Sequence, residues 1–311
     1  MLRSFARSTF RLLAGLGCLT ACTAGAQTGG ATNAASKFPC DPAGAARYTA
    51  YHITAPLQID GRLEEAVWRQ APKSPRFTDL ITGEPTRYDT RAAVLWDDQN
   101  VYVGFWVEEP NVAATFTTHN SPIYENNDVE VFIAGRDTYY EFEINALNTV
   151  YEVFFIWDEA YALGGYGAVP EFRRDNPQVH PFNGVGFTTH PRGRRLGSWA
   201  WTFPGLKTAV HIDGTLNQPA DHDKGWTVEL AFPWAGMKWL AAADHRALPP
   251  QNGDVWRMDF SRFNQSKAPA PAKDSGGWFW SRHGVWDSHI PECFPYITFS
   301  TNDMKTWTPT K

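Results

Sequence analysis

The sequence predicts an all-β protein: an antiparallel β-sandwich of the immunoglobulin or jelly-roll type, with a large loop insertion and one or two short helices. Apolar and polar residues alternate with a period of two through many short segments. Clusters of turn-forming residues separate these segments. The chain also holds 14 Trp, 11 Tyr and 20 Phe, which suits a β-rich core. Together these features favour two packed layers of strands.

The strand-like segments are, in order, 91–96, 101–107, 129–133, 139–145, 150–156, 226–232, 255–260 and 296–299. In the segment 101–107 both alternating faces are apolar, so we expect both to be covered. Helical periodicity is short and rare. It is confined to Leu63 to Gln70 and Trp234 to Ala243.

The segment 160–223 differs from the rest of the chain. It is rich in Gly, Pro, Asn and Arg, and only Leu206 to Ile212 has a strand-like pattern. Long loops in compact domains are usually functional or disordered. We therefore expect one β-sandwich over 48–300, with an insertion at about 160–223 and a C-terminal tail at 301–311.

The first residues have the order of a secretory signal peptide. Three arginines without acidic residues precede a short apolar run, 12–19, and small residues follow. This run is too short to span a bilayer. We assign 1–22 to a signal peptide of the lipoprotein type and 23–47 to a flexible tether.

Two cleavage sites compete after the apolar run. Leu19-Thr20-Ala21-Cys22 is similar to a bacterial lipobox, in which Cys22 becomes the lipid-modified first residue. Ala24-Gly25-Ala26 fits the ordinary signal peptidase. Both predict export: to the cell surface, outer membrane or periplasm as a lipoprotein, or into the medium.

Cysteine use agrees with export. Cys18 lies in the signal peptide and Cys22 in the lipobox, which leaves Cys40 and Cys293 near the two ends of the predicted domain. In an oxidising compartment this pair is expected to form a disulfide. Such a bridge closes a very long loop, which the chain-entropy model values at roughly 5 kcal/mol.

The net charge of the chain limits the classes of binding partner. The net charge is −5 and no basic block occurs, which argues against nucleic acid and anionic membranes. No segment after the signal peptide reaches membrane-spanning length. A membrane is expected as a partner only through the N-terminal lipid.

Six blocks of the sequence resemble the family 9 carbohydrate-binding modules. Leu57 to Trp68 resembles their "I-D-G-x-L-D-E-x-x-W" opening, and Val94 to Val103 their "V-L-W-D-x-x-x-L-Y-V" hairpin. The other blocks are similar to "D-x-V-E-I-F", "Y-Y-x-F-x-V-N", "G-W-x-x-E-x-A-I-P-W" and "H-x-P-x-x-F-G", and lie at 127–133, 139–145, 225–234 and 289–294. Their order and extent resemble the longer subgroup, which carries a mid-domain insertion.

The resemblance implies sugar binding and points to a set of contact residues. Tyr124, six positions before Glu130, matches an aromatic residue of the family's sugar clamp, and Glu130 matches its carboxylate. Asn145 remains as a polar contact. A pyranose offers C–H groups on its faces and hydroxyls at its edge, so aromatic planes beside carboxylates and amides suit it.

Two departures from the family leave the ligand's identity open. Ser288 stands where the second clamp aromatic is expected; Trp286 is the replacement we predict, with Trp278 and Trp280 as further candidates. Glu143 stands where the sugar-binding modules carry Arg.

We predict a non-catalytic protein that binds a poly- or oligosaccharide and supports carbohydrate catabolism, with a glycoside hydrolase as a further partner. No catalytic residues are assigned. Two alternatives stay open: intrinsic O-glycosyl hydrolase activity, using acidic pairs such as Glu141 with Glu143 or Asp128 with Glu130, and a heme, redox or structural role for the surface sandwich.

No cofactor or metal site is firmly predicted. The histidines are scattered singly, and Asp221-His222-Asp223 is better explained as a polar turn. The resemblance allows Ca²⁺, for which loop carboxylates such as Asp97 and Asp98 offer the required oxygen ligands.

Overall fold

A computed structural model of the protein describes residues 37–266 and 268–304. The predicted signal peptide, Cys22 and the first part of the predicted tether lie outside the described residues. The fold below is that of the compact unit that begins at Ser36.

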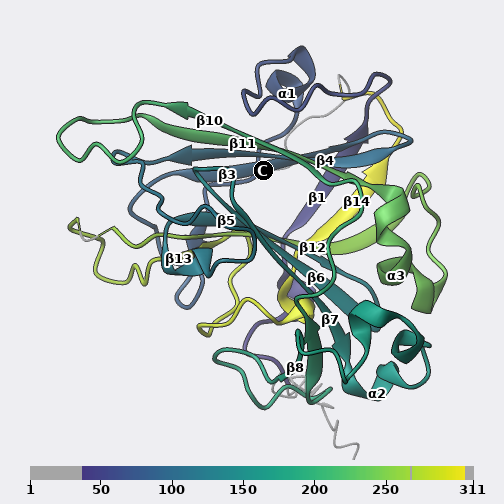
Figure 1. The fold of residues 1–311 in the computed structure, drawn as a ribbon. Helices are drawn as coiled ribbons and strands as arrows, with labels where there is room; N and C mark the ends of the chain where they lie inside the picture. The colour runs from purple at the N-terminus through teal and green to yellow at the C-terminus, as the bar shows by residue number, and fades with distance from the viewer. Residues whose placement is uncertain (1–36, 267, 305–311) are drawn as a thin grey trace, which may run out of the picture. The chain divides into compact units, whose positions relative to one another are not determined.

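Most of the unit is one large sheet (Figure 1). Its strands are β1 (Arg47–His52), β2 (Thr78–Asp79), β3 (Thr90–Trp96), β4 (Asn100–Glu108), β5 (Asp128–Ala134), β6 (Thr138–Asn145), β7 (Val150–Trp157), β8 (Val179–Phe182), β9 (Arg195–Ser198), β10 (Lys207–Asp213), β11 (Gly225–Pro233), β12 (Val255–Phe263), β13 (Gly277–Phe279) and β14 (Tyr296–Ser300). Their order in the sheet is β10-β11-β4-β3-β1-β14-β12-β5-β6-β7-β9-β8, and β13 pairs with β12 and β2.

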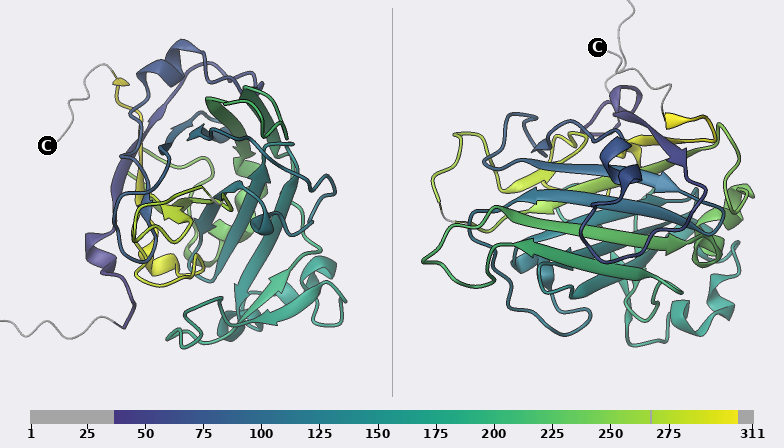
Figure 2. Two further views of the ribbon diagram at one scale, coloured as in Figure 1. Left: turned by 90° about the vertical axis from the view of Figure 1, so that its left-hand side faces the viewer. Right: turned by 90° about the horizontal axis from the view of Figure 1, so that it is seen from above.

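The sheet bends so that its two halves face each other across the core, as the left view of Figure 2 shows. Ring contacts join strands that are far apart in the sheet order. Phe105 on β4 meets Phe260 on β12, with ring centroids 6.2 Å apart. Phe142 on β6 meets Phe232 on β11 at 5.4 Å. The predicted two-layer β architecture is therefore confirmed.

The core between the halves is built from the inward-facing members of the alternating segments. From β5 and β6 these are Val129, Val131, Ile133, Tyr140, Phe142 and Ile144, and from β4 and β11 they are Val101, Val103, Phe105, Val228, Leu230 and Phe232. All are buried. Because side chains alternate across a strand, the remaining residues of β5 and β6 face away from this core.

Strand β1 makes the sheet mixed where the sequence predicts a purely antiparallel one. It lies between β3 and β14 and runs parallel to both, with Arg47 opposite Tyr296 and Tyr51 opposite Leu95. The other pairs of strands are antiparallel. A parallel partner needs no hairpin signal, since it is reached through a long connection.

The helices are short. They are α1 (Ala66–Gln70), α2 (Asp158–Tyr161), α3 (Lys238–Ala241) and the 3₁₀ turns η1 (Pro42–Gly44), η2 (Ile123–Glu125), η3 (Tyr166–Ala168), η4 (Pro170–Phe172), η5 (Trp234–Met237), η6 (Ala242–Asp244) and η7 (Pro291–Cys293). The two predicted helical regions correspond to α1 and to η5–α3–η6. None of the helices in residues 37–266 and 268–304 combines the length and apolar character needed to cross a bilayer.

The insertion is more regular than the sequence predicts. Its strand-like segment is confirmed as β10, which pairs with β11. The strands β8 and β9 were not expected. They form a hairpin-like pair that extends the sheet beyond β7, and Figure 1 shows β8 and α2 below the label of β7.

The predicted disulfide is formed. Cys40 and Cys293 are bonded, with their Cα atoms 5.9 Å apart and 253 positions between them in the sequence. The bridge joins the segment before β1 to the loop before β14. It fits an oxidising, extracytoplasmic compartment.

Candidate functional site

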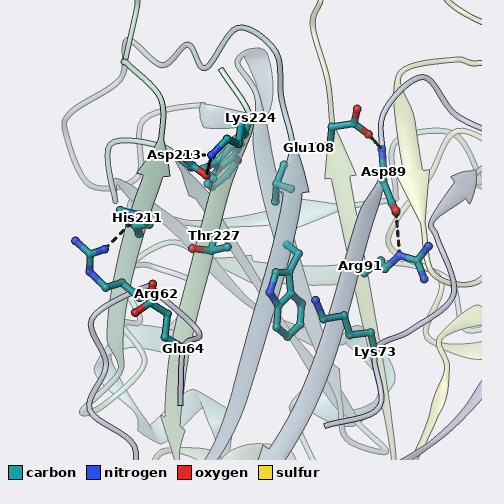
Figure 3. Close-up of a pocket in the computed structure, with 14 residues that line it drawn as sticks. Arg62, Glu64, Lys73, Asp89, Arg91, Glu108, His211, Asp213, Lys224 and Thr227 are labelled. Carbon is teal, nitrogen blue, oxygen red and sulfur yellow. Dashed lines mark hydrogen bonds and ion pairs between the residues drawn. The ribbon is translucent and has the colours of Figure 1, made fainter. Parts of the chain in front are cut away.

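Two cavities of different chemistry lie on the sheet. The first, which we call the charged groove, lies across β3, β4, β11 and β10 and has a volume of about 590 Å³ (Figure 3). Its lining is Arg62, Glu64, Lys73, Asp89, Arg91, Trp106, Val107, Glu108, His211, Asp213, Lys224, Gly225, Trp226 and Thr227.

The charged groove offers few free groups to a ligand. Figure 3 shows Lys224 directed at Asp213, with Nζ to Oδ2 at 3.1 Å, and Arg91 at Asp89, with Nε to Oδ2 at 3.0 Å. The Lys73 ammonium lies 3.7 Å from the centre of the Trp106 ring and covers that aromatic face. A sugar would have to displace this cation before it could stack there.

The second cavity, which we call the aromatic cleft, has a volume of about 350 Å³. Its lining is Tyr124, Glu130, Glu141, Glu143, Tyr151, Phe155, Phe182, Val185, Trp199, Phe263, Gln265, Trp286, Ser288 and His289. Aromatic rings and carboxylates thus converge on one space, which is the composition expected of a site for a polar ring-shaped ligand.

The strand register explains why the carboxylates converge. Ser261 on β12, Glu130 on β5, Glu143 on β6 and Tyr151 on β7 are successive cross-strand partners and form one row across the sheet. This row lies on the face opposite the main core, because Val129, Val131, Phe142 and Ile144 take the other face. The insertion and the loop before β14 cover this row and turn a sheet face into a cleft.

The rim of the aromatic cleft carries two exposed rings. Tyr124 in η2 is 45% exposed and Trp286 is 37% exposed, and both line the same cavity. Each rests edge-on against a more buried ring. Tyr124 packs on Tyr151 at 5.6 Å and 82°, and Trp286 packs on Phe263 at 5.2 Å and 73°. These contacts support the rings while leaving surface open to the cleft.

One carboxylate ties the insertion to the loop that carries Trp286. Asp287 Oδ2 accepts hydrogen bonds from the backbone N–H groups of Val185, Gly186 and Phe187, at 2.8 to 3.0 Å. A Cβ at Gly186 would lie 2.3 Å from the Trp286 carbonyl oxygen, so this close approach requires glycine. The position of Trp286 therefore depends on the insertion.

The floor of the cleft is acidic and shielded from water. Burial raises the pKa of Glu130 to about 8, and Asp259 adds to the rise. Burial, with repulsion from Asp128 and Glu130, also raises the pKa of Glu143 well above its usual value. The pKa of Glu141 is raised by burial and by Glu130. These shifts follow from placing like charges together in a poorly solvated site.

A buried histidine closes one side of the floor. His289 Nε2 lies 3.4 Å from Glu141 Oε1, and its Nδ1 lies 3.2 Å from the Tyr139 hydroxyl. The Arg195 guanidinium donates to the same hydroxyl and to the His289 carbonyl oxygen. Burial lowers the pKa of His289 to about 3, although Asp287 opposes this. The ring is therefore neutral at pH 7.

The structure brings together three of the four predicted contact residues. Tyr124, Glu130 and Trp286 all line the aromatic cleft, and Ser288 lines it beside Trp286. Trp278 and Trp280 do not reach it. Both are buried in the main core.

Asn145 must be corrected as a predicted ligand contact. Its side chain is fully buried and does not line the cleft. Its Nδ2 donates to the Phe116 carbonyl oxygen at 2.9 Å, and its Oδ1 accepts from the backbone N–H groups of Leu147 and Thr149 at 3.0 Å. The Asn145 side chain therefore already has hydrogen-bond partners, and it stabilises the turn between β6 and β7.

Sequence reasoning missed the back wall of the cleft. Phe182 and Trp199 come from the insertion, and Tyr151 and Phe155 come from β7. The available signal was the presence of large aromatic residues within a segment otherwise rich in Gly and Pro. Glu141 and His289 were also not predicted as lining residues.

The carboxylates considered for Ca²⁺ at the sequence level are engaged elsewhere. Asp97 Oδ1 accepts from the backbone of Gln99 and Asn100, and its Oδ2 accepts from the Tyr102 hydroxyl at 2.7 Å. Asp98 lies 3.0 Å from His52 Nε2. These contacts stabilise the β3–β4 turn.

Comparison with known families finds a match over part of the chain. The model for the carbohydrate family 9 binding domain-like family matches residues 59–158, about a third of the chain. That range runs from just before α1 to the end of β7, and so includes Tyr124, Glu130 and Glu143. A search of the curated proteins found no match.

Among the solved structures that align with the chain, one has a TM-score above 0.5 and shares the fold. A "putative carbohydrate-binding protein" from Bacteroides uniformis aligns with a TM-score of 0.53 and 15% identity, over 82% of this chain and 100% of its own. A family 9 module from Caldicellulosiruptor kristjanssonii in complex with cellotriose aligns at 0.45 and 14%, over 85% and 100%. The glucose complex of a family 9 module from the same organism aligns at 0.46 and 14%, over 82% and 97%.

Proposed function

We propose that the chain, whose residues 59–158 match the model of the carbohydrate family 9 binding domain-like family, binds a poly- or oligosaccharide in the aromatic cleft without breaking it down. The observation that carries this proposal is the meeting of two exposed rings, Tyr124 and Trp286, with Glu130 in one cavity. The family 9 modules from Caldicellulosiruptor kristjanssonii were solved with cellotriose and glucose, and we take the ligand here to be of the same general class.

The cleft suits a sugar for physical reasons. The C–H faces of a pyranose pack against aromatic rings, and its hydroxyls need hydrogen-bond partners when they leave water. Tyr124 and Trp286 supply the rings at the rim. Glu130, Glu143 and Gln265 supply polar groups on the floor and at the edge.

The arrangement of the acids supports binding rather than hydrolysis. A glycosidase needs two carboxyl groups that flank the scissile bond, about 5–10 Å apart. Glu130 and Glu143 are instead direct cross-strand partners on the floor of the cleft. Both would approach a bound sugar from the same side.

We further propose that the protein acts outside the cytoplasm in carbohydrate catabolism, alongside a glycoside hydrolase. Residues 1–22 would direct export, and Cys22 would carry a lipid; cleavage after Ala26 is the alternative. The Cys40–Cys293 disulfide supports an oxidising location. Metabolic labelling with a fatty-acid analogue, in wild type and Cys22→Ala, tests the lipid directly.

The binding site is tested by replacing one tryptophan in each cavity. Trp286→Ala should weaken binding to a retained glycan by about 1–3 kcal/mol, since it removes a central stacking surface. Trp106→Ala is the matched control, because Trp106 lines the charged groove. Affinity electrophoresis through a panel of polysaccharides provides the measurement, and thermal melting checks that both variants are folded.

The opposite result would move or remove the site. Retention lost in Trp106→Ala but kept in Trp286→Ala would assign binding to the charged groove. If wild type is not retarded by any glycan in a panel that includes β-glucans, xylans and their oligosaccharides, the proposed function fails.

A further inference from the structure

Three acidic side chains meet at one corner of the aromatic cleft. Asp128 and Glu130 are on β5, and Glu143 is on the neighbouring strand β6, where it pairs directly with Glu130. One carboxylate oxygen from each lies within 4.8 Å of the other two. We call these residues the carboxylate cluster. All three are at most 2% exposed.

The carboxylate cluster has no cationic side chain of its own. Within residues 37–266 and 268–304, no Lys, Arg or His forms an ion pair with Asp128, Glu130 or Glu143. The charge of Arg262 only partly offsets the rise in the pKa of Asp128. Arg262 pairs with Glu109, and His289 lies against Glu141. Three uncompensated carboxylates in a buried site would be strongly unfavourable.

Hydrogen bonds satisfy only part of the carboxylate cluster. Asp128 Oδ1 accepts from the Phe263 backbone at 3.1 Å, and Glu130 Oε2 accepts from the Ser261 hydroxyl at 2.6 Å. Asp128 Oδ2 and Glu143 Oε2 are buried without any hydrogen-bond partner. Buried polar atoms without partners are rare in folded proteins and point to a missing ligand, ion or water.

Protonation alone does not resolve this. Burial and mutual repulsion raise the pKa values of Asp128 and Glu143, which favours their neutral forms. A neutral carboxyl group still carries an O–H that needs an acceptor. Neither orphan oxygen has a hydrogen-bond partner, so the acceptor for such a proton has to be another oxygen of the carboxylate cluster, and the remaining charge there still has no cation.

We propose that the carboxylate cluster binds a hard divalent cation of the Ca²⁺ type, and that this cation supplies the polar contact to the ligand's hydroxyls. The second part rests on the proposed sugar-binding function. Asp128 would hold the ion from behind, while Glu130 and Glu143 hold it from the floor of the cleft, which they line.

The chemistry of the donors selects the type of ion. The three donors are carboxylate oxygens, which suit hard cations; Ca²⁺ takes 6–8 oxygen ligands, some of them from water or a bound molecule. Zn²⁺ and Cu²⁺ sites draw on nitrogen and sulfur ligands. The cleft gives the ion an open side, where adjacent sugar hydroxyls can complete the coordination.

The test begins with the purified exported protein after treatment with EDTA. Calorimetric titration should show one Ca²⁺ bound per chain, and Ca²⁺ should raise the thermal unfolding midpoint. Glu143→Gln should weaken Ca²⁺ binding at least tenfold, because it removes one charge and one oxygen from the carboxylate cluster. Asp128→Asn should do the same.

Glu125→Gln is the matched control. Glu125 is exposed on the same turn as Tyr124 and lies outside the carboxylate cluster. It should leave Ca²⁺ binding unchanged. Glu143→Gln is expected to fold, since in EDTA it relieves repulsion, so its unfolding midpoint should equal or exceed that of wild type.

Three results would overturn the proposal. The first is no binding heat and no midpoint shift with millimolar Ca²⁺, Mg²⁺ or Mn²⁺. The second is equal Ca²⁺ affinity in Glu143→Gln and wild type. The third is stabilisation in EDTA by glucosamine but not by Ca²⁺, which would show that the cluster takes an organic ammonium group instead.

Glycan retention measured with Ca²⁺ and with EDTA separates this proposal from the proposed function. Retention that needs Ca²⁺ supports both. Retention that persists in EDTA, in a protein that binds no metal, overturns the cation site and leaves sugar binding intact. Stoichiometric Ca²⁺ binding without retention of any glycan supports the ion site and overturns the sugar contact.

Discussion

Glu229 and Glu143 are both buried glutamates on central strands, yet their surroundings differ completely. Glu229 on β11 accepts hydrogen bonds from the Trp68 indole N–H at 2.8 Å and from the backbones of Asp60 and Gly61 at 2.9 and 3.1 Å. Glu143 on β6 has an oxygen with no partner and two acidic neighbours. Both carboxylate oxygens of Glu229 accept hydrogen bonds, whereas one oxygen of Glu143 accepts none.

This difference distinguishes a glutamate that stabilises the fold from one that is expected to bind a ligand. The donors around Glu229 come from the α1 region, which this carboxylate attaches to the sheet. Around Glu143 only a backbone hydrogen bond from Tyr124 favours the charged form, and burial and the neighbouring acids outweigh it. This is the pattern expected where a site is completed by a ligand.

The first prediction concerns the aromatic cleft and the way the stability of the protein depends on pH. The pKa of His289 falls from 6.5 to about 3 in the folded protein, so the unfolded state binds the extra proton between these values. Stability is therefore full above pH 6.5 and falls as the pH drops towards 3, by about 4 kcal/mol from this group.

Urea unfolding at several pH values between 4 and 7 measures this slope. His289→Gln should flatten it, whereas His222→Gln, which changes an exposed histidine, should not. An identical slope in wild type and His289→Gln would show that the cleft floor does not hold this ring neutral.

The second prediction concerns Glu229, whose carboxylate oxygens both have hydrogen-bond donors. Glu229→Gln places an amide N–H₂ where buried N–H groups now find an acceptor, so the free energy of unfolding should fall by about 3 kcal/mol. Chemical denaturation measures the loss. Glu64→Gln, at an exposed position near the same segment, should stay within about 0.5 kcal/mol of wild type. A loss that small in Glu229→Gln would remove the contrast.

The third prediction makes the same substitution at Glu143, the glutamate that does not have donors for both of its oxygens. In EDTA at pH 7, Glu143→Gln should raise the free energy of unfolding, because burial and repulsion from Asp128 and Glu130 disfavour the charge of Glu143. The same change thus has opposite signs at two buried glutamates. A clear destabilisation of Glu143→Gln would mean that an unrecognised partner satisfies this carboxylate.

Much of the fold was predictable because it rests on local patterns. Alternating segments such as 129–133 and 226–232 are strands in the interior of the sheet, as their patterns predict. The place of β1 was not predictable. Its partners are distant in sequence and parallel, so no turn between them marks the pairing.

The candidate site was predictable only in part. The resemblance indicated Tyr124 and Glu130, and the cluster of Trp residues indicated Trp286. The burial of Glu143 was not predictable, because a strand with alternating Glu has the same pattern whether its polar face meets water or a cleft. Whether Glu143 is buried depends on the insertion, which covers this face of the sheet. The sequences of β8 and β9 have no strong alternating pattern, so the insertion's strands could not be predicted.

The disulfide between Cys40 and Cys293 also determines which strands bear a pulling force that is applied to the chain before Cys40. Both β1 and β14 begin within a few residues after their cysteine, and they run parallel as neighbours. A pull on the chain upstream of Cys40 therefore reaches a covalent junction before it reaches any strand, and draws both strands in the same direction. The hydrogen bonds between them bear little sliding force, so a load applied from that side is shared rather than peeling β1 away.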